Sequence, residues 1–158
     1  MGLVLTDMQV TSSAFEHGGR IPTKHTAEGD NVSPALQWSD PPAETQSFAV
    51  ICHDPDAPFI APGVYGFVHW VLYNLPASTT SLEEGTSAGT TGPHDGGDAG
   101  YFGPLPPEGH GPHHYYFWVL ALDSELDLEP GLTMWQLLER IEPHVLGMNR
   151  LMGVYERG

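Results

Sequence analysis

The stretch that decides the fold is His113–Leu122, HHYYFWVLAL, which is dominated by aromatic and aliphatic side chains. Apolar residues occupy both alternating sets of positions, which is typical of a central strand covered on both faces. Phe67–Leu75 (FVHWVLYNL) repeats this pattern, and Phe48–Asp54 (FAVICHD) is a shorter run rich in β-branched residues. We expect a last strand over Arg150–Tyr155. The chain is therefore predicted to be mainly β.

One helix is indicated near the end of the chain. Thr133 and Gln136 form a Thr-x-x-Gln capping box. Apolar residues then recur at helical spacing as far as Val145. We expect Pro143 to kink this helix or to begin a second short one. The resulting prediction is an antiparallel β protein with a C-terminal helix.

Length and composition favour a single ordered domain over residues 1–158. Nineteen glycines and 15 prolines accompany four tryptophans, six tyrosines and six phenylalanines. This mixture favours strands joined by ordered loops and excludes a helix bundle. The segment from Glu83 to Gly111 is nearly all Gly, Pro, Thr, Ser, Asp and His. A loop of this length is uncommon in a compact domain unless it has a function.

The charge is strongly acidic, with 5 Lys and Arg against 20 Asp and Glu and a net charge of −15. Nucleic acid and anionic membrane surfaces are therefore poor partners for this chain, and no nucleic-acid partner is expected. We interpret the acidity as adaptation to a high-salt cytoplasm, where about 1 M salt shortens the Debye length to about 3 Å. An ordinary acidic protein is the alternative. Without a secretory signal or an apolar run of about 18 residues, a soluble cytoplasmic protein with no membrane span is expected.

Strand alternation predicts a cluster of polar side chains, because residues two apart share a face. His113 and Tyr115 then point to one face, and His114 points to the other. Asp54 ends the first apolar strand, and His69 lies near the start of the second. If these strands are neighbours, Asp54, His69, His113 and Tyr115 converge at one end of the sheet.

This cluster has the chemistry of an oxyanion pocket. We expect His69 to share its face with Phe67 and Val71. Two imidazoles and a phenol supply N–H and O–H donors, and an imidazole near Asp54 tends to stay protonated. Together with backbone N–H groups from a Gly/Pro-rich loop, these donors suit a small oxyanion, phosphate above all.

Other chemistries are less well supported by the sequence. His110, His113, His114 and Asp54 offer metal ligands, but alternation separates the two adjacent histidines, so no metal site is predicted. Gly85–Gly89 (GTSAG) fits the serine-hydrolase pattern but lacks the strand and helix that this motif requires. The single cysteine, Cys52, lies within an apolar strand and is expected to be inert. We therefore assign no catalytic residue and no cofactor.

Four stretches resemble a known family when taken together and in order. They are DPDAP at 54–58, GFVHW at 66–70, YFGPLPP at 101–107 and GPHHY at 111–115. They are similar to the signature blocks of the phosphatidylethanolamine-binding protein family, and more narrowly to its Raf-kinase-inhibitor-like branch from bacteria and archaea. The resemblance extends over residues 4–157.

The resemblance implies a large antiparallel sheet packed against a smaller sheet, with a C-terminal helix, and a pocket for a small anion. The positions that match the family's pocket are Asp54, Asp56, Pro58, His69, Pro106, Pro107, Gly109, His113 and Tyr115. Two positions depart from the family pattern: His114 replaces the usual arginine, and Leu105 replaces a cysteine common in this branch, at the pocket rim. Trp38 and Phe102 could form an apolar wall of the pocket or pack in the core.

We therefore predict a binding protein for a small anion such as phosphate, phosphoethanolamine or a carboxylate. Asp54 would orient and charge an imidazole, and Asp56 and Pro58 would shape the mouth of the pocket. A regulatory role as a kinase or protease inhibitor is compatible with the resemblance, which also leaves a homodimer open. The alternative is an acid–base enzyme acting on a small phosphorylated or carbonyl substrate.

Overall fold

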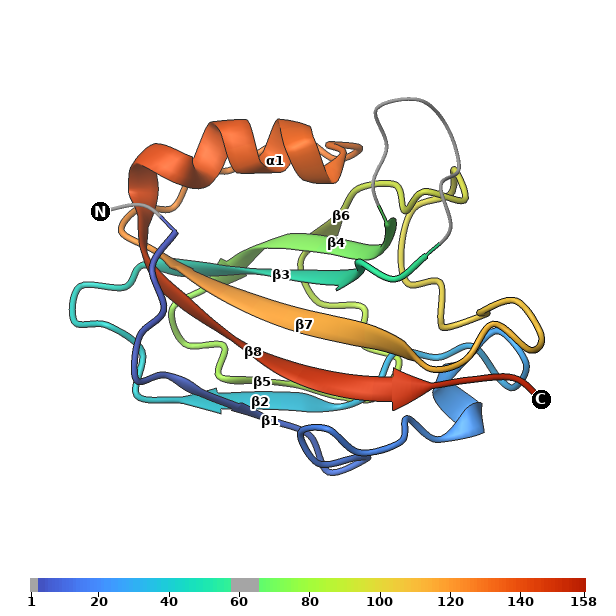
Figure 1. Ribbon diagram of the computed structural model, residues 1–158. Helices are drawn as coiled ribbons and strands as arrows, with labels where there is room; N and C mark the ends of the chain where they lie inside the picture. Colours follow the sequence, from blue (N-terminus) through green and yellow to red (C-terminus); the bar gives the residue numbers. More distant parts are fainter. Residues whose placement is uncertain (1–2, 58–65) are drawn as a thin grey trace.

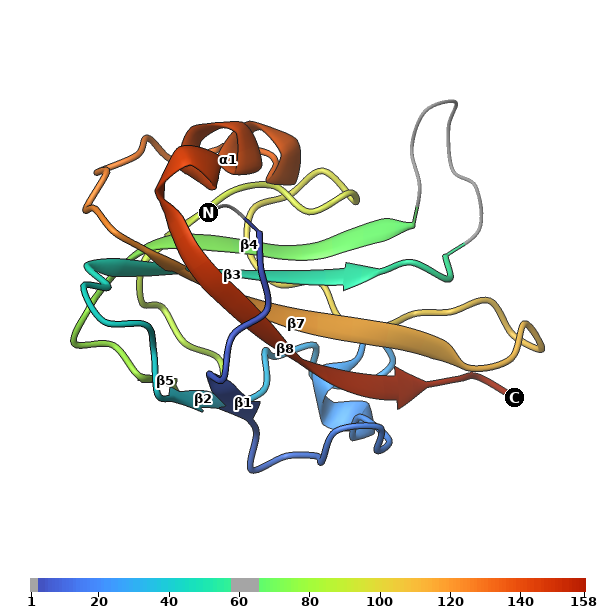
Figure 2. The ribbon, with the colours of Figure 1, turned by 60° about the vertical axis from the view of Figure 1, so that its left-hand side comes forward.

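The computed structural model describes residues 3–57 and 66–158, so the predicted site residue Pro58 lies outside the described residues. The molecule has three layers: helix α1 (Met134–Ile141) covers one face of a five-stranded sheet, and a three-stranded sheet covers the other face (Figure 1). The same layers are seen from a second direction in Figure 2. The predicted fold class, a mainly β protein with two sheets and a C-terminal helix, is confirmed.

Both sheets are antiparallel throughout. The large sheet has the order β6 (Thr90–Thr91), β4 (Phe67–Pro76), β3 (Ser47–Asp54), β7 (His113–Leu122) and β8 (Val145–Tyr155). The small sheet has the order β1 (Gln9–Thr11), β2 (Leu36–Ser39) and β5 (Ser81–Leu82). Two 3₁₀ turns complete the structure, η1 (Thr23–His25) and η2 (Glu142–His144).

The predicted capping box of α1 is confirmed. The Thr133 hydroxyl accepts a hydrogen bond from the Gln136 backbone N–H at 3.2 Å, and the Gln136 side-chain oxygen accepts one from the Thr133 N–H at 3.0 Å. Pro143 lies in the second short helix, η2. Two expectations were wrong here: Val145 does not end the helix, and the last strand begins at Val145 rather than at Arg150.

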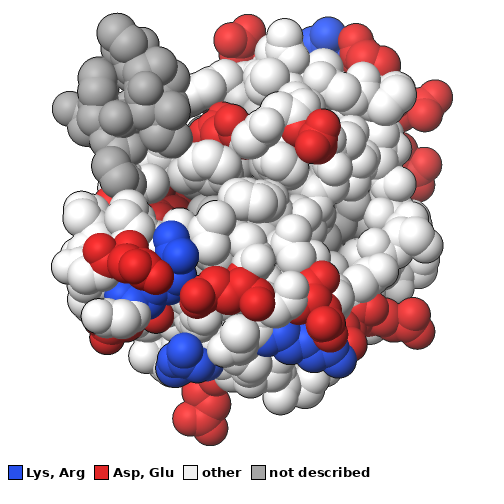
Figure 3. All heavy atoms as spheres, turned by 90° about the vertical axis from the view of Figure 1, so that its right-hand side faces the viewer, with Lys and Arg blue, Asp and Glu red and all other residues white. Residues whose placement is uncertain are grey.

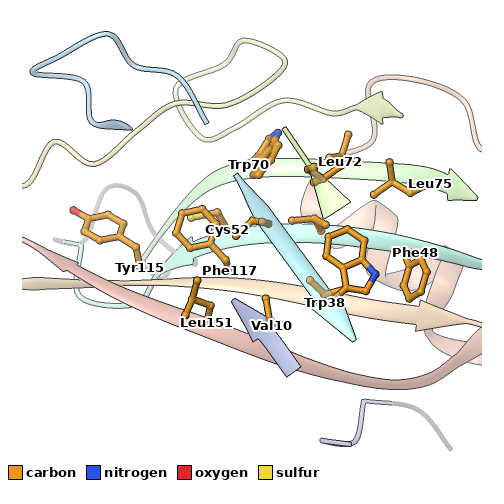
Figure 4. Close-up of a cluster of buried hydrophobic side chains, with 14 of the residues drawn as sticks. Val10, Trp38, Phe48, Cys52, Trp70, Leu72, Leu75, Tyr115, Phe117 and Leu151 are labelled. Carbon is orange, nitrogen blue, oxygen red and sulfur yellow. The ribbon is translucent and has the colours of Figure 1, made fainter. Parts of the chain in front are cut away.

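The core forms on both faces of the large sheet because its central strands are apolar on both sides. Tyr115 and Phe117 on β7 pack toward the small sheet (Figure 4), and Val119 belongs to the same cluster. Leu120 and Leu122, at the alternate positions of β7, pack toward α1. Trp38 belongs to the first cluster, with its ring 5.4 Å from that of Phe48, so it is a core residue.

A β-bulge interrupts the alternation of β4 where the site begins. Cys52 pairs with Trp70 and His53 pairs with Val68, so His69 is an extra residue without a partner on β3. Trp70 consequently belongs to the cluster on the small-sheet side, and Val71 to the cluster on the α1 side. The expectation that His69 shares its face with Val71 was wrong, because the bulge intervenes.

The long segment from Glu83 to Gly111 contains β6 and a bridge between Pro93 and Ala99, and is otherwise irregular. It is nevertheless anchored to the end of the large sheet. The Phe102 N–H donates to the carbonyl oxygen of His69 at 2.9 Å, and the Gly103 N–H donates to the side-chain oxygen of Asn31 at 2.6 Å. The segment therefore brings the residues from Phe102 to Pro107 against β4.

Candidate functional site

A cavity of about 240 Å³ opens at the end of the large sheet, where β3 ends and β4 and β7 begin. Six of the predicted site residues line it: Asp54, His69, Pro106, Pro107, His113 and Tyr115. The remaining wall is apolar and comes from Ala57, Phe67, Phe102 and Leu105. Strand ends thus supply the polar groups, and the long irregular segment supplies much of the apolar wall.

Gly66 allows β3 and β4 to come together at this point. Its φ of +66° is in the left-handed region, and a Cβ at this position would collide with the carbonyl oxygen of Asp54. Glycine is therefore required directly before β4, which explains why this residue precedes Phe67 in the sequence.

Two other predicted residues do not line the cavity. Asp56 is exposed and turns toward His114, from which its Oδ2 accepts hydrogen bonds at 2.8 Å from the backbone N–H and at 2.6 Å from Nδ1. Gly109 is also exposed, and its N–H donates to the carbonyl oxygen of Arg157 at 3.0 Å. Both assignments came from the family resemblance, and neither residue is among the described residues that line the cavity.

A buried aspartate–histidine pair forms the polar end of the cavity. Nδ1 of His113 lies 2.7 Å from Oδ2 of Asp54, and the two side chains are only 2% and 3% exposed. Oδ1 of Asp54 accepts the Asp56 backbone N–H at 2.7 Å. Burial raises the pKa of Asp54, and the hydrogen bonds from His113 and Asp56 offset only part of that effect.

His110 completes a chain of hydrogen-bonding groups that the sequence did not reveal. Its Nδ1 lies 2.7 Å from Nε2 of His113, so both ring nitrogens of His113 are engaged. The sequence indicated His110 only as a metal-ligand candidate. A turn in which the His110 N–H donates to the carbonyl oxygen of Pro107 at 3.1 Å positions its ring. A ligand that bonds to Nε2 of His113 must therefore share that nitrogen with His110 or displace it.

His69 is buried and neutral near pH 7. Its Nδ1 lies 2.5 Å from the carbonyl oxygen of Phe102, and since a carbonyl only accepts, Nδ1 carries the proton. Burial lowers the pKa of His69 from 6.5 to about 4. Its Nε2 then presents a lone pair and is an acceptor. We expected this imidazole to donate to an anion, and the observed bonding gives it the opposite role.

Tyr115 supplies the donor that His69 does not. Its ring is buried between the core cluster and the cavity, with the hydroxyl pointing away from the other labelled side chains in Figure 4. Burial raises the pKa of Tyr115, and the nearby Asp54 acts in the same direction, so the phenol keeps its proton. No hydrogen bond to another residue of 3–57 or 66–158 engages this hydroxyl, which leaves it available to a ligand.

The charge around the cavity is unusual for an anion site. The described lining residues include no lysine or arginine. Arg157 lies nearby, but its Nε–H donates to the carbonyl oxygen of Pro106 at 2.6 Å. Figure 3, which looks onto this end of the molecule, shows acidic groups spread over the face and the few basic groups lying beside them. Within the described part of the chain, no three His, Cys, Asp or Glu side chains form a cluster suited to a metal ion.

Comparison with known proteins agrees with this fold and cavity. A family model described as phosphatidylethanolamine-binding protein matches residues 11–156. A UPF0098 protein of Methanothermobacter thermautotrophicus is 43% identical over 158 residues, covering 96% of this chain and 100% of the relative. The structure of YbcL from E. coli, described as a member of the mammalian PEBP family, has a TM-score of 0.88 at 33% identity, covering 97% of this chain and 100% of YbcL.

A PEBP homolog from Chlamydia trachomatis has a TM-score of 0.89 at 39% identity, covering 96% of this chain and 98% of the homolog. The chain belongs to the phosphatidylethanolamine-binding protein family, so the resemblance predicted from the sequence is confirmed. None of the helices described by the structure is long and apolar enough to cross a membrane.

Proposed function

We propose that this protein binds a small anion, a phosphate or carboxylate, in the cavity at the end of the large sheet. The observation that carries the proposal is the buried Asp54–His113 pair beside the unengaged Tyr115 hydroxyl, in a cavity with otherwise apolar walls. A protonated His113 balances the Asp54 carboxylate and offers an N–H, while Tyr115 offers an O–H. Exclusion of water by the apolar wall strengthens both bonds.

Calorimetric titration with phosphate, phosphoethanolamine and acetate tests this proposal. High KCl is used because it screens the repulsion between the acidic surface and an incoming anion. We expect saturable binding of at least one anion by the wild type and by the control variant His114→Ala, and loss of that binding in His113→Ala. Absence of saturable binding by the wild type, or undiminished binding by His113→Ala, would contradict the proposal.

Two further variants keep the test informative if His113→Ala folds poorly. Tyr115→Phe removes only the hydroxyl and is expected to weaken binding about tenfold or more, since a hydrogen bond to a charged group is lost. His110→Ala is expected to strengthen binding a few-fold, because His110 competes with the ligand for Nε2 of His113. Equal affinities of the wild type, Tyr115→Phe and His110→Ala would mean that the anion binds elsewhere.

An acid–base enzyme is the second candidate, and one observation favours it. The chain from Asp54 through His113 to the exposed His110 connects the cavity to solvent by hydrogen-bonding groups that can carry a proton. An enzyme of this kind would turn over members of a panel of small esters and phosphoesters, with the activity lost in His113→Ala. Lack of turnover across the panel, with anion binding intact, would contradict the enzyme and support the binding function by itself.

A further inference from the structure

The Nε2 atom of His69 is an acceptor facing a cavity that is proposed to hold an anion. His69 is 4% exposed and lines the cavity. Its Nδ1–H donates to the Phe102 carbonyl oxygen, and the Phe102 N–H donates to the His69 carbonyl oxygen. These two hydrogen bonds fix the orientation of the His69 ring. Among the described residues Nε2 has no hydrogen-bond partner. This acceptor opens to the cavity, where water can donate to it, so a ligand that displaces that water must bring a proton of its own to avoid leaving the acceptor unpaired.

The rest of the polar wall limits what that molecule can be. Asp54 contributes only carboxylate oxygens, both already bonded, to His113 and to the Asp56 N–H. Tyr115 supplies an unengaged donor, and lysine and arginine are absent from the part of the lining that the structure describes. The groups that titrate around His69, namely His53, His94 and His113, all act to lower its pKa, as does its burial. The wall therefore holds an acceptor, a donor and little positive charge.

We infer that the cavity selects oxyanions that carry a proton of their own, such as the monoanions of phosphate, phosphate monoesters and phosphonates, over fully deprotonated oxyanions such as sulfate and sulfonates. The inference rests on the proposed anion-binding function and names the ligand class within it. The ligand's O–H donates to Nε2 of His69, and another of its oxygens accepts from Tyr115.

The physical basis is the match of donors to acceptors. A sulfate or sulfonate has oxygen lone pairs only, so placing it against Nε2 of His69 sets two acceptors together and leaves both unsatisfied. A phosphonate or phosphate monoester near pH 6 is largely or partly a monoanion with one O–H, because its second pKa lies near that range. A single negative charge also suits a cavity whose described lining residues include no lysine or arginine.

Two probes of equal charge and similar size test the effect of the ligand's proton by itself. Methylphosphonate monoanion and methanesulfonate have the same charge and nearly the same shape, and only the phosphonate has an O–H. Titrations are made at about pH 6, where phosphate-type groups still hold a proton. We expect the wild type to bind methylphosphonate at least about tenfold more tightly than methanesulfonate. The variant His69→Phe is expected to lose this preference, while His114→Gln, outside the cavity, is expected to keep it.

The outcomes distinguish the inference from the function on which it rests. Equal or tighter binding of methanesulfonate by the wild type would overturn the inference and leave anion binding intact. No binding of either probe, nor of phosphate or acetate, would overturn the proposed function and the inference with it. A preference for methylphosphonate that His69→Phe retains would overturn the role of His69.

Discussion

Two aspartate–histidine pairs lie side by side at the end of the large sheet, and they differ in burial rather than in chemistry. Nδ1 of His113 is 2.7 Å from Oδ2 of Asp54, and Nδ1 of His114 is 2.6 Å from Oδ2 of Asp56. The first pair is 2% and 3% exposed, and the second is 39% and 40% exposed. Strand alternation alone separates them, since adjacent residues on β7 face opposite sides.

Because the two pairs differ in burial, the pKa values of their carboxyl groups shift in opposite directions. Burial raises the pKa of Asp54 more than its hydrogen bonds lower it. Partial burial also acts to raise the pKa of Asp56, but the hydrogen bonds from the side chain and backbone of His114 outweigh it and lower the pKa. The comparison teaches that burial, rather than contact distance, decides in which direction the pKa of each carboxyl group shifts.

The largest expected effect comes from breaking each pair in turn. His113→Ala leaves Asp54 buried without its partner and is expected to cost about 3–5 kcal/mol of unfolding free energy. His114→Ala breaks an exposed pair and is expected to cost about 1 kcal/mol or less. Urea denaturation of both variants and the wild type at one salt concentration measures the difference. Similar losses in the two variants would show that burial does not separate the pairs.

The pH dependence of stability sharpens the comparison by adding His69, which is buried without a carboxylate. Its pKa falls from 6.5 in the unfolded chain to about 4 in the folded protein, so protonation favours unfolding. This group's contribution is complete above about pH 6.5 and lost as the pH falls through about 4, a change of about 3 kcal/mol. Asp54, with a pKa raised from 3.8, contributes with the opposite sign from about pH 3.8 upward, so its contribution overlaps with that of His69.

Unfolding free energies of the wild type and His69→Gln, measured from about pH 7 to pH 4, isolate this contribution because Asp54 is present in both proteins. We expect a flatter curve for the variant across that interval. Parallel curves would contradict the assignment of His69 as a neutral acceptor.

The smallest expected effect is that of salt on the exposed pair. Asp56→Asn is expected to cost less than about 1 kcal/mol at low salt, and the cost should disappear near 1 M KCl, where the Debye length is about 3 Å. The cost of His113→Ala should hardly change over the same range, because buried charges are screened much less. A salt-independent Asp56→Asn effect would indicate that the pair acts through packing instead.

Sequence patterns predicted the central strands well because these strands are apolar on both faces. The bounds of β7 agree residue for residue with His113–Leu122, and the opposite orientation of His113 and His114 follows from them. The small sheet could not be predicted, since β1, β2 and β5 are too short to show a pattern. The apolar core between the two sheets, rather than local sequence, stabilises the pairing of these short strands.

Within the site, residues on strands were predicted and interactions across loops were not. The bulge at His69 depends on the register between β3 and β4, which local sequence does not encode. The bond from His69 to the Phe102 carbonyl spans 33 positions and uses a backbone atom, so no side-chain motif reveals it. Asp56 and Gly109 came from the resemblance and lie outside the cavity, where His114 and Arg157 engage them.

The lone thiol of Cys52 has a practical consequence. It is the chain's single cysteine, fully buried on β3 two residues before Asp54, and burial raises its pKa well above the usual range. A thiol reagent can reach it only when the strand carrying the site separates from its neighbours, β4 and β7. The rate of labelling by such a reagent therefore measures how often this strand opens, without the need to introduce a cysteine by mutation.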